Sequence, residues 1–205
     1  MKQLTILCLF ISIQASAQKY FTEKYQPFNS NIDSPELFLG YPIGSEHTRH
    51  DNIISYFKNL ALKSDRAILK FYGKTHEGRK LPILIISSTE NISKIDEIQK
   101  KHLLIVDPNN NMQPNENDPL IINLAYNVHG NEPSSSEAAL LAAYTLTASN
   151  NNKILNFINN SIIFIDPAIN PDGRDRHTQW VNSYKANPLV NDPNDAEHNE
   201  NWPRG

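Results

Sequence analysis

The sequence LIINLAYNVHGNE, residues 120–132, decides the fold, because a nearly continuous apolar run leads directly into residues with metal-ligand chemistry. Such a run is typical of a strand buried on both faces of a sheet. Ser134 and Glu137 have the spacing of a capping box and predict a helix that continues to about Ala148. The β-branched run 161–165 predicts a second buried strand. Strand, helix and strand in this order predict a right-handed crossover and a parallel strand pair.

Other segments add to this unit. Apolar positions with helical spacing predict a helix at residues 50–62. Two strand-like runs at 67–72 and 81–87 predict an antiparallel hairpin. Weaker patterns add a charged helix at 93–101, a strand at 102–106 and a helix at 151–158. The fold class that these patterns predict is α/β, with a mixed, largely parallel open sheet and helices on both faces.

The N-terminal residues have the layout of an export signal. Lys2 precedes an apolar run that is too short to span a bilayer, and small residues lead up to Ala17. We therefore expect a signal peptide at 1–17, an N-terminal extension at 18–48 and a domain at 49–205. The protein is expected to be secreted or periplasmic, with no membrane insertion after signal cleavage. Because residues 182–205 show no apolar period, we also expect the domain to be truncated at its C-terminal end.

Composition argues against several classes of protein. The 205 residues carry a formal net charge of -3, so no basic surface is available for a nucleic acid. The single cysteine, Cys8, lies inside the expected signal peptide, which leaves the mature chain without thiol or disulfide chemistry. Nothing in the sequence indicates an oligomeric state.

The sharpest chemical feature is the motif His129-Gly130-Asn131-Glu132, between a predicted strand and a predicted helix. Ligands of open α/β sheets gather at the carboxyl ends of strands. An imidazole nitrogen and a carboxylate three positions apart on a tight turn can bind one cation, and both are ligands that Zn²⁺ accepts. We therefore predict that His129 and Glu132 are zinc ligands. A histidine and a glutamate at this spacing also occur by chance, so the placement at a strand end carries the argument.

A second motif, Asn170-Pro171-Asp172-Gly173, follows the second predicted core strand. By propensity alone it is a good β-turn. Paired with H-G-N-E at the end of the other core strand, however, it resembles the zinc carboxypeptidase family. In that family H-x-x-E supplies the first two zinc ligands and N-P-D-G marks the next strand end. The segment 72–86, with its glycines before a strand, is similar to the early hairpin of the same family.

The resemblance implies a partial zinc carboxypeptidase-like catalytic domain at 49–205 that uses one Zn²⁺ ion per complete site. It implies exopeptidase-type hydrolysis of peptide bonds, with a peptide or a peptidoglycan stem as substrate. In this family the metal lowers the pKa of a water molecule and polarises the carbonyl oxygen. Arg176 is the candidate for the arginine that stabilises the oxyanion, and Arg174 competes for that role. Two surface arginines beside Asp175 are the plain alternative.

The family pattern also requires a third zinc ligand and a glutamate general base, and neither can be placed before Gly205. His198 lies in a polar stretch and is more simply a solvated loop histidine. The chain alone is therefore expected to be inactive, because two protein ligands hold zinc weakly.

The sequence is also compatible with two other functions. One is a zinc acylase of the aspartoacylase or desuccinylase type, which shares the general fold and the string H-G-N-E. The other is a non-catalytic module that binds a peptide or a glycan in the same crevice. The N-P-D-G motif and the export signal favour the peptidase.

Overall fold

The computed structural model describes residues 23–200. The expected signal peptide at 1–17, with Cys8, lies outside the described residues, as do residues 201–205. Between residues 23 and 200, none of the helices combines the length and the apolar character that a membrane crossing requires.

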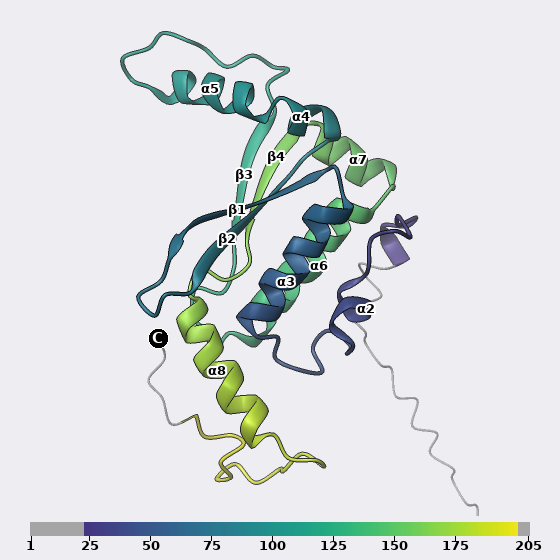
Figure 1. Ribbon diagram of the computed structural model, residues 1–205, viewed down its shortest axis with the longest axis vertical. Coiled ribbons are helices and arrows are strands. Elements are labelled where there is room, and N and C mark those ends of the chain that lie inside the picture. Colours follow the sequence, from purple (N-terminus) through teal and green to yellow (C-terminus); the bar gives the residue numbers. More distant parts are fainter. Residues whose placement is uncertain (1–22, 201–205) are drawn as a thin grey trace, which may run out of the picture.

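A four-stranded mixed sheet forms the centre of the fold, with the strand order β1-β2-β4-β3 (Figure 1). The strands are β1 (Ala67–Lys74), β2 (Lys80–Ile86), β3 (Leu120–Ala125) and β4 (Ser161–Asp166). β1 and β2 form the predicted antiparallel hairpin. β3 and β4 form the predicted parallel pair, joined by a helical crossover. The α/β class and the mixed sheet are thus confirmed.

Two long helices, α3 (His50–Lys63) and α6 (Pro133–Ala148), lie side by side along one face of the sheet (Figure 1). Both were predicted from their sequence patterns. The remaining helices are α2 (Pro35–Leu39), α4 (Thr89–Ser93), α5 (Ile95–Val106), α7 (Asn152–Asn159) and α8 (Pro171–Tyr184). In Figure 1, α5 and α8 lie at opposite ends of the molecule.

The core lies between the sheet and helices α3 and α6. Alternate residues of the central strands point into it, among them Leu84, Ile163 and Ile165, each fully buried. Because successive side chains of a strand face opposite sides, Ile83, Ile121 and Phe164 point to the other face. There they line one cavity of about 420 Å³ together with residues of α5. Helices therefore lie on both faces, although α5 covers one end only.

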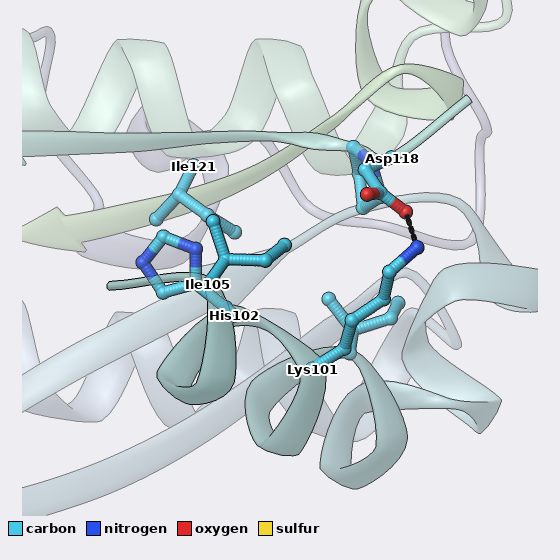
Figure 2. Close-up of a pocket in the computed structure, with 7 residues that line it drawn as sticks. Lys101, His102, Ile105, Asp118 and Ile121 are labelled. Carbon is cyan, nitrogen blue, oxygen red and sulfur yellow. Dashed lines mark hydrogen bonds and ion pairs between the residues drawn. The ribbon is translucent and has the colours of Figure 1, made fainter. Parts of the chain in front are cut away.

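The small contact between α5 and the start of β3 is drawn in Figure 2. Lys101 of α5 pairs with Asp118, and His102 and Ile105 line the same cavity of about 40 Å³ as Ile121. The strand predicted at 102–106 is therefore wrong, because these residues form the end of α5. Ile98 and Ile105, seven positions apart on one side of the helix, both contact this cavity, which is helical rather than strand-like spacing.

Two expectations about the sheet need correction. It is not largely parallel, since β2 runs antiparallel to β4 and only β3 and β4 are parallel. The hairpin places its return strand beside β4 without a crossover, and only the crossover produces a parallel pair. Nor is β3 buried on both faces. Within residues 23–200 it is the edge strand, and its first residue, Leu120, is 65% exposed.

The N-terminal extension contributes to the core as well as to the surface. Ile32 is 3% exposed within the core cluster, and Phe28 stacks on Tyr144 of α6. Phe28 also forms a β-bridge with Ser149 at the end of α6. Residues that precede the predicted domain are thus packed against it.

Leu60 and Leu62 of α3 provide a matched test of this packing, because Leu60 is fully buried and Leu62 is 85% exposed. We expect Leu60→Ala to lower the free energy of unfolding by about 2–5 kcal/mol through lost burial and a cavity. Leu62→Ala should change it by less than about 0.5 kcal/mol. Urea unfolding of both variants measures the difference, and equal losses would contradict the core described above.

Candidate functional site

The motif H-G-N-E lies at the carboxyl end of β3, where the chain turns into α6. β3 and β4 stay joined past their strand ends, since Tyr126 N donates to Asp166 O at 2.9 Å and Ile169 N donates to Tyr126 O at 3.0 Å. Glu132 is the N-cap residue of α6. The predicted capping box of Ser134 and Glu137 is therefore wrong, and Glu137 is instead used in a buried ion pair.

The side chains of His129 and Glu132 point toward each other. His129 Nδ1 lies 3.2 Å from Glu132 Oε1, and the two side chains are 58% and 53% exposed. Ligand atoms of a tetrahedral zinc site, each about 2.1 Å from the metal, lie about 3.4 Å apart. The two atoms therefore have nearly the separation of adjacent zinc ligands, and they are open to solvent. The donor set, one imidazole nitrogen and one carboxylate oxygen, fits zinc.

Asn127 holds this turn in place. It is 1% exposed and has the left-handed φ of 57°, a conformation that asparagine tolerates better than most residues. Its side chain amide donates to His129 O at 2.8 Å and to Glu132 O at 3.3 Å. Its backbone N–H donates to Ser135 Oγ at 2.7 Å. Sequence reasoning missed Asn127, although an asparagine just past a strand end is a recognisable turn residue.

Gly130 brings the two motifs together. A Cβ atom at Gly130 would lie 1.9 Å from the backbone carbon of Gly173 and 2.4 Å from the backbone nitrogen of Arg174. The backbone of H-G-N-E therefore packs directly on the backbone of N-P-D-G, and only glycine fits at this contact.

The motif N-P-D-G begins helix α8 and is not the β-turn that propensity alone predicts. Asn170 is the N-cap residue, and its Oδ1 accepts from Gly173 N at 3.0 Å. Its Nδ2 donates to Val128 O at 3.1 Å, the residue before His129. Pro171 takes the first helical position, where a missing N–H costs nothing. A turn and a helix start share the same local residues, and the contact with the first motif selects the helix.

Arg174 and Arg176 have different environments. Arg174 is fully buried and donates to Glu137 Oε1 at 2.6 Å. Arg176 keeps a 36% exposed side chain, and its Nη2 donates to Glu77 Oε1 at 3.2 Å. Arg174 is thus committed to the interior, and of the two only Arg176 presents a guanidinium to solvent.

An ion-pair cluster joins the tip of the β1–β2 hairpin to the start of α8. Arg79 pairs with Asp172 at 2.8 Å and with Asp175 at 2.7 Å, and it also contacts Glu77. Thr75 Oγ1 donates to Asp172 Oδ1 at 2.7 Å. Partial burial alone would raise the pKa of Asp172, but the hydrogen bonds from Thr75 and Arg79 lower it below its ordinary value. Asp172 therefore stays charged.

A histidine pair lies on the side of α8. The rings of His47 and His177 are 5.2 Å apart, and His177 Nδ1 is 3.5 Å from Glu200 Oε1. Glu200 also accepts from Asn131 of the H-G-N-E turn at 3.4 Å. Burial, reinforced by His177 and Arg174, lowers the pKa of His47 from 6.5 to about 4. Burial likewise lowers the pKa of His177.

Among residues 23–200, no group of three or more His, Cys, Asp or Glu side chains converges as a metal site would require. His198 does not lie with His129 and Glu132, because its Nε2 contacts Val190 O within its own loop. The large apolar cavity beneath α5 is also not part of this site. It involves Ile121 near the start of β3, whereas H-G-N-E follows the end of that strand.

One family model matches most of this chain. The family model of the zinc carboxypeptidases matches residues 53–205. Among solved structures, thrombin activatable fibrinolysis inhibitor is 16% identical with a TM-score of 0.48, over 69% of this chain and 31% of that chain. Carboxypeptidase A from Helicoverpa armigera is 19% identical with a TM-score of 0.43, over 77% of this chain and 31% of that chain. The chain thus spans about a third of the length of each. No curated protein matches.

The Gly130 contact can be tested by adding one methyl group. Gly130→Ala should lower the free energy of unfolding by about 1–3 kcal/mol or more, because the new Cβ overlaps backbone that cannot move aside easily. Gly73→Ala is the control, since its Cβ would meet only Leu81 Cδ1 at an ordinary 3.7 Å. Chemical unfolding of both variants measures the loss, and a Gly130→Ala variant as stable as Gly73→Ala would contradict the close approach.

The depressed pKa of His47 has a consequence for stability. The unfolded chain takes up a proton on His47 near pH 6.5, whereas the folded protein does so near pH 4. Stability is therefore expected to fall as the pH drops from 6.5 toward 4, because protons bind preferentially to the unfolded state. Urea midpoints across this range should decline less steeply in His47→Gln than in the exposed control His76→Gln. Identical slopes in the two variants would contradict this assignment.

Proposed function

The chain belongs to the zinc carboxypeptidase family, and on that premise we propose that it contributes to the zinc-dependent, exopeptidase-type hydrolysis of peptide bonds. The observation that supports this most directly is the 3.2 Å approach of His129 Nδ1 and Glu132 Oε1 at the carboxyl end of β3. Candidate substrates are a peptide or a peptidoglycan stem with a free terminal carboxylate. The family match favours this function over the acylase and over the non-catalytic module.

His129 and Glu132 would hold the zinc ion in this proposal. When bound, zinc supplies a Lewis acid that polarises a carbonyl oxygen and lowers the pKa of a water molecule. A hydrolytic zinc site has three protein ligands, so activity requires one more ligand than this pair. We therefore propose that residues 23–200 by themselves bind zinc weakly and do not hydrolyse peptides efficiently.

The residues around the pair would orient it. Asn127 fixes both ends of the turn through bonds to His129 O and Glu132 O. Gly130 seats the turn on the start of α8, and Asn170 ties that helix start to Val128. Arg176, which holds a charge near a solvent-open edge, is proposed to stabilise negative charge on the substrate carbonyl oxygen. Its pairing with Glu77 would position the guanidinium.

We also propose that the protein is exported, which rests on the signal-like residues 1–17 alone. A secreted or periplasmic location would bring the site to extracellular peptides or cell-wall stems. Sequencing the N-terminus of the mature protein tests this, and a chain that retains Met1 would contradict it.

The metal-ligand assignment is tested by titrating the chain with Zn²⁺ and following the histidine ring signals by NMR. His129→Ala and Glu132→Ala should each weaken zinc binding by about tenfold or more, because each removes one ligand. The matched controls His102→Ala and Glu116→Ala, both remote from the turn, should bind as the unmodified chain does. Ring shifts that do not involve His129 would overturn the proposed site.

The reaction class has its own test. In a mixture of peptides with free C-termini and the same peptides with amidated C-termini, the slow cleavage that this chain would support should occur only at the free ends, because an exopeptidase of this class needs the terminal carboxylate. Release of the acyl group from N-acyl amino acids instead would favour the acylase. The measurement is mass spectrometry of the products with and without added Zn²⁺.

A further inference from the structure

Arg174 is among the largest fully buried side chains between residues 23 and 200. Its guanidinium is spread over three acceptors. Nη2 donates to Glu137 Oε1 at 2.6 Å, Nη1 donates to Pro133 O at 3.2 Å, and Nε donates to Thr48 O at 3.1 Å. One side chain therefore joins α8 to the first turn of α6 and to the residue that precedes α3 by two positions.

Glu137 completes this unit from the other side. Its Oε1 accepts from Thr48 N at 2.8 Å, and its Oε2 accepts from Thr48 Oγ1 at 2.7 Å. Tyr41 donates to the same Thr48 hydroxyl at 3.0 Å. Both carboxylate oxygens are thus bonded, so the buried charge pair has the partners that burial demands.

The unit acts on the residues beside the candidate zinc ligand. Pro133, which accepts from Arg174, follows Glu132 directly, and Glu132 caps the helix that begins there. The backbone nitrogen of Arg174 also lies against Gly130, between His129 and Glu132. Arg174 therefore contacts this segment twice, through its main chain at Gly130 within H-G-N-E and through its guanidinium at Pro133 directly after the motif.

Stability alone is a weak reason for such a pair. Removing two charges from water costs more than their attraction commonly returns, and apolar replacements of buried ion pairs are often neutral or stabilising. What an arginine adds is direction, because its planar fork fixes several acceptors at once. Here the acceptors belong to the segments that set the position of Glu132.

We infer that Arg174, together with Glu137, is a positioning residue that sets the orientation of Glu132 toward His129 and thereby the zinc affinity of the pair. This inference rests on the proposed function, since it concerns the same two ligands. Arg174 itself does not touch the metal or the substrate in this scheme. Its effect reaches the ligand pair through Pro133 and the first turn of α6.

The test compares stability with metal affinity in variants of the whole chain. Arg174→Met leaves the buried charge of Glu137 without its ion-pair partner, so it should lower both the stability and the zinc affinity. The double variant Arg174→Met with Glu137→Gln removes both charges while glutamine still accepts from Thr48 N. We expect the double variant to recover most of the stability but to keep a zinc dissociation constant about tenfold or more above that of the unmodified chain.

Zinc binding is followed by the His129 ring signals in NMR, and Co²⁺ absorption spectra report ligand geometry separately from affinity. Arg66→Met is the matched control. Arg66 anchors the far end of α6, where it donates to Ser149 O at 2.7 Å and to Asn150 Oδ1 at 2.9 Å. The Arg66→Met variant should be less stable than the unmodified chain but should show the same zinc affinity and the same Co²⁺ spectrum.

Arg174→Lys keeps the positive charge but lacks the planar guanidinium that binds several acceptors at once. This variant tests the positioning role even if the methionine variants fold poorly. We expect it to fold and to bind zinc several-fold more weakly. Zinc affinity equal to that of the unmodified chain in Arg174→Lys or in the double variant would overturn the positioning role and leave a purely structural pair. If His129→Ala binds zinc as well as the unmodified chain, the proposed function itself fails, whatever Arg174 does.

Discussion

The contact between two backbones at Gly130 is the constraint on which the candidate site depends. No side chain fits between Gly130 and Gly173, so the turn after β3 and the helix start after β4 meet at main-chain distance. A parallel strand pair brings the carboxyl ends of β3 and β4 to one edge of the sheet. The glycine contact then fixes these two segments against each other. His129 and Glu132 face each other on a turn whose backbone packs on the start of α8.

Polar interactions hold α8 against the rest of the chain, which explains why its sequence lacks an apolar stripe. Its buried residues include Arg174, His177 and Thr178, and its first turn is held by Arg79 through Asp172 and Asp175. Such bonds are directional, whereas apolar packing is not. A helix that must present a particular edge to the candidate site gains more from directional partners than from additional hydrophobic area.

The apolar core and the candidate site lie at different parts of the sheet. The face covered by α3 and α6 carries the apolar core that stabilises the fold. The candidate site lies at the edge of the sheet beyond that core, on a turn and a helix end, where the side chains of His129 and Glu132 are 58% and 53% exposed. The apolar core and the His129–Glu132 pair are therefore separate parts of the structure.

The sequence by itself determined the elements whose patterns are local and periodic. The apolar spacing of α3, the β-rich runs of the hairpin and the strand–helix–strand order of the crossover were sufficient to predict the α/β class, and the position of His129 and Glu132 after a strand was sufficient to nominate them. Only the tertiary structure decided what depends on distant partners. N-P-D-G became a helix start because Asn170 bonds Val128, and within residues 23–200 β3 became an edge strand. Arg174 was buried by Thr48 and Glu137, each far away along the chain. The periodicity of a sequence indicates which side chains of an element point into the core, but it does not indicate which residues they contact there.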